Sequence, residues 1–378
     1  MVLLLKTKEK RKEGILSLHK VIISGGGTGG HIFPAIAIAN EIKEEYPACE
    51  ILFVGAKGRM EMTRVPEAGY PIRGLNIAGI QRKVDLKNLL LPLKVLQSYI
   101  QAMAIIREFK PQIVVGVGGY ASGPLLMAAQ LSGIPTLIQE QNSYAGVTNK
   151  ILARRAKKIC VAYDGMDAYF PAHKLVFTGN PVRSDMVNWK GKKEEALAHF
   201  GLDAERPVIL AIGGSLGARS INEALAEHIN RFRDAGVQLL WQTGKTYSDK
   251  ATTMAGDGIH VTPFIQRMDL AYAAADVIIS RAGALSISEL CLVGKPVILV
   301  PSPYVSEDHQ TKNARVLVKA GAALTVADRE ASAILVDEAL TLLRKNELKS
   351  QLSASILRLG VADAASRIRK EMETLIHA

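Results

Sequence analysis

The stretch Lys20–Ala37, KVIISGGGTGGHIFPAIA, decides how the rest of the chain is interpreted. Val21–Ser24 is a short apolar run that predicts a strand, and Gly25–Gly30 follows as a glycine-rich loop. The next residues open a helix, and we expect Pro34 in its first turn, where proline is tolerated. Glycine lets a backbone approach a ligand closely, and a helix N-terminus carries partial positive charge. The order strand, glycine loop, helix therefore predicts a site for phosphate or for a related substrate group.

The spacing of Gly25, Gly27 and Gly30 also satisfies the dinucleotide pattern G-x-G-x-x-G. A nicotinamide-binding fold needs, in addition, an acidic residue at the end of its second strand. The second predicted strand, Ile51–Val54, is followed by Gly-Ala-Lys, so the sequence argues against NAD. His31 stands at the mouth of the loop, and its imidazole can accept a proton near neutral pH. It is either a candidate general base or a helix-start residue bonded to the backbone.

Length and composition indicate a globular protein of two domains. The 378 residues are 48% hydrophobic and 22% charged, with a net charge of +11. Such a basic excess suits phosphorylated substrates, an anionic membrane surface or nucleic acid. Only 5% of the residues are aromatic, and basic and aromatic residues are not interleaved, so we expect no nucleic acid partner.

Neither the cysteines nor the acidic residues form a metal-binding pattern. Cys49, Cys160 and Cys291 lie far apart, which suits free thiols in a reducing cytoplasm. We therefore expect neither a metal nor a cofactor. Residues 1–14 place a few apolar residues before a charged run, the reverse of a signal peptide, and we interpret residues 1–19 as an extension. No run reaches the ~18 apolar residues of a membrane-spanning helix.

Strand and helix patterns alternate along the chain, which predicts parallel sheets covered on both faces. The pattern restarts at Pro207–Ile212, where a second apolar strand leads into a second glycine loop, Gly213–Ala218. We therefore predict an α/β protein with two doubly wound, Rossmann-like domains. The domains are expected at residues 1–182 and 183–361, followed by a C-terminal helix at about 362–378.

Seven motifs, in one order from Lys20 to the C-terminal helix, resemble the family of lipid-linked N-acetylglucosaminyltransferases of peptidoglycan synthesis. Each motif alone is weak, and the set in order is specific. The motifs are Gly26–His31, Gly118–Tyr120 with Ser122–Pro124, Glu140–Asn142, Gly179–Arg183, Gly213–Ser215 with Gly217 and Ala218, Arg281–Ala284 with Ser288 and Glu289, and Asp308–Gln310 with Asn313 and Ala314.

The resemblance implies a GT-B glycosyltransferase, whose two domains face each other across a cleft. The implied donor is UDP-N-acetylglucosamine, and the implied acceptor is lipid I, the undecaprenyl-diphosphate-linked N-acetylmuramoyl-pentapeptide. Transfer to the acceptor 4-hydroxyl inverts the donor configuration and gives lipid II without a metal. The first domain would take the acceptor and meet the membrane, with the C-terminal helix packed back on it, and the second would bind the UDP-sugar. The implied location is peripheral, on the cytoplasmic face of the cell membrane, and other cell-wall synthesis proteins are further candidate partners.

The resemblance also implies a role for individual residues. His31 would be the general base, and Ser215, with the backbone of its glycine loop, would bind the donor phosphates; the alternative for that loop is a structural turn. Arg183 would support the diphosphate or be a surface residue at the hinge. Glu289 would bind the ribose or be an ordinary helix-surface residue. The remaining substrate-binding candidates are Thr28, Gly29, Gly30, Asn142, Ile265 (through its backbone), Ala284, Leu285, Ser286, Ile287, Ser288 and Gln310, the last with helix capping as its alternative.

A predicted helix near residue 90 carries apolar residues at helical spacing, namely Leu89, Leu93, Leu96, Ile100 and Met103. We expect most of this face to pack on its own sheet. The loop Ile77–Lys87 contains Ile80 and several basic residues and is the stronger candidate for contact with an anionic bilayer.

Three readings remain open at the level of sequence. The first is the peptidoglycan enzyme. The second is another GT-B protein, either a diacylglycerol glycosyltransferase or a UDP-N-acetylglucosamine 2-epimerase. The third is a membrane-surface scaffold that binds a nucleotide sugar without turnover. Transfer of radiolabel from the donor to a lipid I analogue separates them.

Overall fold

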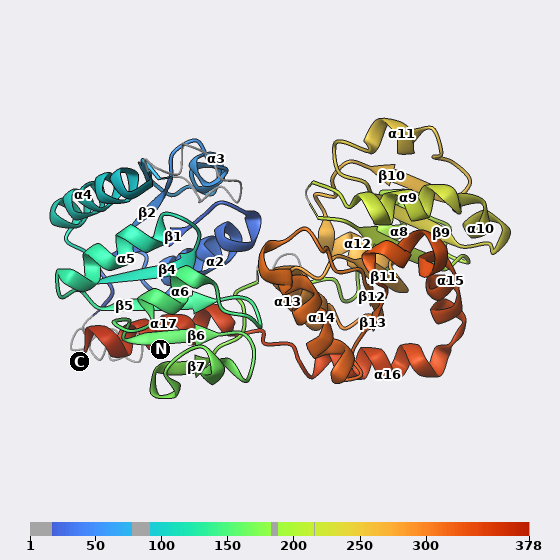
Figure 1. Cartoon of the computed structure of the whole chain (residues 1–378). Coiled ribbons are helices and arrows are strands. Elements are labelled where there is room, and N and C mark those ends of the chain that lie inside the picture. The colour runs from blue at the N-terminus through green and yellow to red at the C-terminus, as the bar shows by residue number, and fades with distance from the viewer. Residues whose placement is uncertain (1–16, 78–90, 183–187, 215, 378) are drawn as a thin grey trace, which may run out of the picture. The chain divides into compact units, whose positions relative to one another are not determined.

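The computed structural model describes residues 17–77, 91–182, 188–214 and 216–377 of the chain. The chain divides into two compact units, each with its own sheet (Figure 1). Unit 1 comprises residues 1–181 and 363–378, and unit 2 comprises residues 182–362.

The sheet of unit 1 has seven parallel strands in the order β3-β2-β1-β4-β5-β6-β7. Alternate residues of a strand point to opposite faces, so Ile22 packs into one core while Val21 and Ile23 pack into the other. The strands are β1 Lys20–Gly25, β2 Glu50–Ala56, β3 Ile72–Leu75, β4 Ile113–Gly118, β5 Thr136–Glu140, β6 Lys158–Val161 and β7 Leu175–Phe177.

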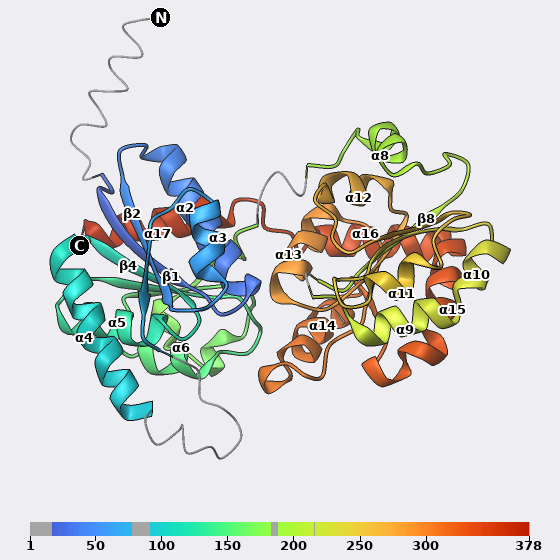
Figure 2. The ribbon, with the colours of Figure 1, turned by 90° about the horizontal axis from the view of Figure 1, so that it is seen from above.

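Helices cover both faces of this sheet (Figure 2). One face packs against α4 Leu91–Phe109, α5 Ser122–Leu131 and α6 Val147–Leu152. The other packs against α2 Gly29–Glu45, α3 Glu61–Glu67 and α17 Ala364–Ile376. The C-terminal helix α17 lies against α2, where Arg369 pairs with Glu41 at 3.0 Å. Burial on both faces explains why the strands are apolar throughout.

The sheet of unit 2 has six parallel strands in the order β10-β9-β8-β11-β12-β13. They are β8 Val208–Ile212, β9 Gln238–Gln242, β10 Ile259–Thr262, β11 Val277–Ser280, β12 Val297–Leu299 and β13 Leu324–Thr325. One core lies under α8 Lys193–Phe200, α12 Met268–Ala274, α13 Ala284–Val293 and α14 His309–Lys319. The other lies under α9 Arg219–Glu227, α10 Ile229–Asp234, α11 Ser248–Thr252 and α15 Ala331–Arg344, and α16 Asn346–Leu357 contributes to both.

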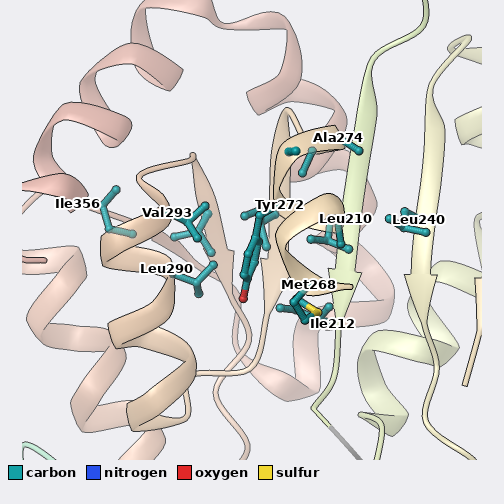
Figure 3. Packing of buried hydrophobic residues seen from close by; sticks show 14 of the residues in the cluster. Leu210, Ile212, Leu240, Met268, Tyr272, Ala274, Leu290, Val293 and Ile356 are labelled. Carbon is teal, nitrogen blue, oxygen red and sulfur yellow. The ribbon is translucent and has the colours of Figure 1, made fainter. Parts of the chain in front are cut away.

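The buried ring of Tyr272 fills the first of these cores. Figure 3 shows it between Leu290 and Val293 of α13 on one side and Leu210 of β8 on the other. Because the ring is fully buried, its hydroxyl group needs a hydrogen-bond partner. The partner is Glu289, as described below.

Each sheet reverses its strand order at one point, between β1 and β4 in unit 1 and between β8 and β11 in unit 2. Ligands of open parallel sheets bind outside the carboxyl ends of the strands at such a point. The two predicted glycine loops follow β1 and β8. The expected fold class, two doubly wound α/β sheets, is confirmed.

Two local predictions were wrong, and one strand was missed. Helix α2 begins at Gly29 because Thr28 is its extended N-cap, so Pro34 is the sixth helical residue and lies in the second turn. Helix α4 buries Ala102, Ile105 and Ile106, whereas Leu93, Leu96 and Ile100 are exposed rather than packed on the sheet. Strand β13 was not predicted, since two residues leave no pattern to read. Leu89, Ile80 and most of the loop 77–87 lie outside the described residues.

Candidate active site

The first glycine loop places His31 in the opening turn of α2. Thr28 is the exposed N-cap, and Gly29 and Gly30 are the first helical residues. The Nδ1 atom of His31 lies 3.0 Å from the carbonyl oxygen of Gly26. A carbonyl oxygen can only accept, so Nδ1 must carry the hydrogen. In the neutral imidazole the lone pair is then on Nε2, the form that a general base requires.

The two glycines at the end of β4, Gly118 and Gly119, make room for the imidazole ring of His31. A Cβ on Gly118 would lie 2.6 Å from Cδ2 and 2.8 Å from Nε2 of His31. A Cβ on Gly119 would lie 2.5 Å from the carbonyl oxygen of Gly26. Both residues have positive φ, +109° and +93°. Glycine is thus required here by contacts within unit 1.

Glu61, the first residue of α3, was not singled out in the sequence. Its side chain is buried, and its carboxylate accepts the N–H groups of Gly27 at 2.8 Å and of Ala56 at 2.9 Å. A Cβ on Gly26 would lie 2.2 Å from its Oε1 atom. The missing side chain of Gly26 therefore accommodates a carboxylate from the next βα unit.

The loop after β5 is held by Glu140. Its carboxylate accepts the backbone N–H of Gly146 at 3.1 Å and the side-chain amide of Asn149 at 2.9 Å. It also accepts the backbone N–H of Asn142 at 3.2 Å. The next residue, Gln141, donates to the carbonyl oxygen of Val117 at 2.7 Å, which ties this loop to the end of β4. The structure thus brings together His31, Thr28–Gly30 and the loop that carries Asn142, at the carboxyl ends of β1, β4 and β5.

The second glycine loop joins the end of β8 to α9. A Cβ on Gly217 would lie 2.1 Å from the carbonyl oxygen of Thr243, so this turn is packed tightly against the end of β9. Gln242 bridges two candidate segments, because it donates to the carbonyl oxygen of Gly214 at 3.0 Å and accepts the N–H of Ile265 at 3.0 Å. This role of Gln242 was missed in the sequence. Ser215 and Arg183 lie outside the described residues.

Ile265 is 3% exposed, and its side chain belongs to the core. Because Gln242 accepts its N–H group, the carbonyl group is the remaining backbone group with which it could contact a ligand. A hollow of about 900 Å³ beside β10 is also lined by Ile265, but by none of the other candidates.

The helix α13 begins after β11 with Gly283 as its extended N-cap. Ala284, Leu285 and Ser286 are half-buried in its first turn. Ile287 is buried in the core, and the Ser288 hydroxyl group donates to the carbonyl oxygen of Ala284 at 3.0 Å.

Glu289 accepts a hydrogen bond from the Tyr272 hydroxyl group at 3.3 Å. Burial, reinforced by the Glu289 carboxylate, raises the pKa of Tyr272 well above its usual value. Tyr272 thus remains a neutral donor and orients the carboxylate.

Gln310 lies in the first turn of α14. Its side-chain oxygen accepts the N–H of Ser302 at 2.9 Å, which holds the loop after β12. The preceding Asp308 is the N-cap in a left-handed conformation, and it accepts from the Thr311 hydroxyl group at 2.6 Å. The hydrogen bond from Ser302 therefore gives Gln310 a structural role that does not depend on sugar binding.

Arg281, in the motif after β11, is an anchor within unit 2. Its guanidinium group pairs with Asp328 and donates to the carbonyl oxygen of Val300 at 3.0 Å and to Ser220 at 3.1 Å. Its side chain is only 13% exposed. The contacts fix the start of α13 relative to the helix that follows the second glycine loop.

Among the residues that the structure describes, no three or more His, Cys, Asp or Glu side chains are grouped so that they could hold a metal ion. Within the same ranges, no helix combines the length and the apolarity needed to cross a bilayer.

Comparison with known proteins covers both units. Residues 21–161 match the glycosyltransferase family 28 N-terminal domain, and residues 208–368 match the family 28 C-terminal domain. The chain is 56% identical over 371 residues to the UDP-N-acetylglucosamine–N-acetylmuramyl-(pentapeptide) pyrophosphoryl-undecaprenol N-acetylglucosamine transferase of Bacteroides fragilis, which covers 97% of this chain and 98% of the relative. The protein of the same name from Phocaeicola vulgatus is 55% identical over 358 residues, with 93% and 95% covered.

Among solved structures, MurG of Acinetobacter baumannii matches with a TM-score of 0.75 and 29% identity, covering 94% of this chain and 99% of that one. The chain therefore belongs to the MurG family of glycosyltransferases, within glycosyltransferase family 28.

Proposed function

We propose that this chain transfers N-acetylglucosamine from UDP-N-acetylglucosamine to the 4-hydroxyl group of the N-acetylmuramoyl residue of lipid I, giving lipid II. The observation that carries the proposal is 56% identity, over nearly the whole chain, to a transferase named for this donor and this lipid-linked acceptor. The 2-epimerase, diacylglycerol transferase and scaffold readings have no comparable support.

The chemical step is a single displacement. The acceptor oxygen attacks C1 of the donor sugar as the bond from C1 to the diphosphate breaks, and the configuration inverts. His31 takes the proton from the acceptor hydroxyl group. The protonation of its Nδ1 supports this role, because it leaves a lone pair on Nε2. Thr28–Gly30 and Asn142 line the same end of the unit 1 sheet and bind the sugar or the acceptor.

Unit 2 binds the donor nucleotide. Backbone N–H groups of the loop Gly214–Ala218, with Ser215, hold the diphosphate at the start of α9, and Arg183 supports it. Glu289 accepts the ribose hydroxyl groups, Ile265 contacts uracil through its carbonyl group, and Gln310 binds the sugar. The start of α13, from Ala284 to Ser288, supplies backbone groups. No metal takes part, because backbone groups and the helix terminus serve the leaving diphosphate.

Unit 1, which includes the C-terminal helix α17, forms the acceptor and membrane-associated domain, and unit 2 forms the UDP-sugar domain. The exposed apolar side chains of α4 support a membrane contact, since Leu93 is 64%, Leu96 55% and Ile100 60% exposed. Lys94 and Arg107 of the same helix are exposed beside them. An apolar strip with basic neighbours suits peripheral attachment to the anionic cytoplasmic face of the membrane.

The test is transfer of radiolabel from UDP-N-acetylglucosamine to a lipid I analogue, with and without EDTA. We expect labelled lipid II at the same rate in both. Conversion of the donor to its 2-epimer without labelled lipid would contradict the proposal, and so would binding of the donor with no turnover. Loss of transfer in EDTA, restored by Mg²⁺, would contradict the metal-independent mechanism.

A further inference from the structure

One peptide group in unit 1 joins two ionisable side chains that lie 30 residues apart in the sequence. The carbonyl oxygen of Gly26 accepts from His31 Nδ1 at 3.0 Å. The N–H of the same peptide group, that of Gly27, donates to the Glu61 carboxylate at 2.8 Å. Carboxylate, peptide and imidazole thus form one continuous chain of hydrogen bonds.

We propose that Glu61 is a positioning residue that acts on His31 through the Gly26–Gly27 peptide group. The inference rests on the proposed function, in which His31 accepts the acceptor proton. Glu61 touches neither the substrate nor the imidazole. It fixes the orientation of the peptide, and thereby the tautomer and the orientation of the ring.

The physical basis is polarisation of the amide. A carboxylate that accepts an amide N–H draws positive charge to the nitrogen side and increases the negative charge on the carbonyl oxygen. The carbonyl oxygen of Gly26 then binds the His31 Nδ1–H more strongly, and binds it more strongly still once the ring is protonated. The arrangement serves the purpose of a carboxylate that orients a histidine directly, with one peptide group inserted between them.

The packing around the peptide shows that the arrangement is built into the fold. Glu61 is 1% exposed, and its other oxygen is held by the N–H of Ala56 at the end of β2. A Cβ on Gly26 would strike the carboxylate at 2.2 Å, and a Cβ on Gly55 would strike its Cγ at 2.5 Å. On the far side, a Cβ on Gly119 would meet the peptide oxygen at 2.5 Å. Three glycines thus clear the space that the carboxylate and the peptide occupy.

The test variant is Glu61→Gln, which keeps the shape, removes the charge and places an amide N–H₂ group against a backbone donor. The matched control is Val65→Ala, which loosens the same helix, α3, from the core but leaves the carboxylate in place. The base must be unprotonated to act, so kcat rises with pH as the base loses its proton. This rise is the acid limb of the pH profile. A base with a lower pKa places the acid limb at lower pH.

We expect Glu61→Gln to lower kcat roughly 10- to 100-fold, with the KM for the donor little changed. We expect the acid limb of its kcat profile to move down by roughly half to one pH unit. Val65→Ala should lower the melting temperature and leave the limb in place. If the limb of Glu61→Gln coincides with that of the wild type while the wild type transfers sugar, the inference is overturned and the proposed function stands.

A second measurement does not depend on turnover. In ¹⁵N-histidine-labelled wild-type protein, the His31 signal, identified by its loss in His31→Gln, should show the Nδ1–H tautomer. In Glu61→Gln the tautomers should become mixed. The Nε2–H tautomer in the wild type would overturn the inference even if Glu61→Gln failed to fold.

Discussion

At the residue scale, we propose different chemical tasks for the two units. His31 sits where the backbone fixes its tautomer, and Glu289 sits where a buried tyrosine fixes its carboxylate. In both contacts the partner is a neutral group, a backbone carbonyl oxygen for the imidazole and a phenol hydroxyl group for the carboxylate.

Replacing His31 with Ala should lower kcat by roughly 10² to 10⁴, the usual contribution of a general base. The KM for UDP-N-acetylglucosamine should change little, because the residues that we propose for the nucleotide lie in unit 2. Steady-state kinetics with a lipid I analogue measures both values, and circular dichroism checks the fold. A variant with near-normal kcat would remove His31 from the mechanism.

Replacing Glu289 with Gln should raise the KM for the donor roughly 10- to 150-fold, because hydrogen bonds to a charged group contribute about 1.5–3 kcal/mol. Calorimetric titration with UDP tests the same effect without turnover. Glu338→Gln, a change of an exposed carboxylate on α15, is the control and should bind UDP as the wild type does. Equal affinity of all three proteins would exclude Glu289 from the nucleotide site.

Part of this site could be predicted from sequence. The glycine loops and His31 carry local signals, since a strand, a glycine run and a helix start follow one another directly. Glu61 and Gln242 could not be found in this way. Each contacts a loop more than 20 residues away, and nothing near either residue distinguishes it from an ordinary helix or strand residue. The glycine at position 26 was noticed, but the carboxylate that fills its space was not.

At the element scale, α4 separates a buried face from an exposed one. The sequence showed the apolar spacing, yet spacing alone does not say which of two apolar faces meets the sheet. Ala102, Ile105 and Ile106 pack on the strands. Leu93, Leu96 and Ile100 lie on the other face and are exposed. An exposed apolar strip of this kind is typical of an interaction surface.

A double change, Leu96→Glu with Ile100→Glu, should weaken binding to vesicles that contain anionic lipid. It replaces two apolar side chains with negative charges, which the anionic surface repels. Co-sedimentation should show a loss of roughly tenfold or more. Transfer to a water-soluble acceptor analogue should stay normal. The control is Leu357→Glu, an exposed apolar residue on α16 of unit 2. If the control lost as much vesicle binding as the double variant, α4 would not be the contact.

The junction of α8 with α12 gives a prediction that depends on pH. Arg267, and to a lesser extent Lys192, hold the pKa of Asp269 well below its usual value. The side chain of Asp269 is 9% exposed. A depressed pKa in the folded state stabilises the protein above the unfolded pKa of about 4, and this stabilisation is lost as the pH falls further.

Asp269→Asn should therefore lower the free energy of unfolding by about 1–2 kcal/mol at pH 7, a moderate value because Arg267 is half-exposed. Urea unfolding at a series of pH values should show this difference shrinking below about pH 4. Asp249→Asn, at an exposed site on α11, should show no such difference. If the difference in the free energy of unfolding between the wild type and Asp269→Asn stayed constant down to pH 3, the ionic explanation would be contradicted.

At the scale of the whole molecule, the alternation of strands and helices was enough to predict two doubly wound sheets. Strands that are apolar along nearly their whole length are compatible with few folds, because only a sheet covered on both faces buries all of their side chains. The start of α2 and the two-residue strand β13 were missed, since they depend on capping and on pairing with β12. The C-terminal helix α17 joins unit 1 through Ile368 and Met372, a contact between the two ends of the chain.

We propose that the nucleotide binds to unit 2 and that the general base lies in unit 1. A crystal structure of the chain with UDP tests this division most directly. We expect the diphosphate on the backbone of Gly214–Ala218 and the ribose hydroxyl groups on Glu289. A nucleotide bound instead at Gly25–Gly30 of unit 1, with Glu289 making no contact to it, would contradict the proposal.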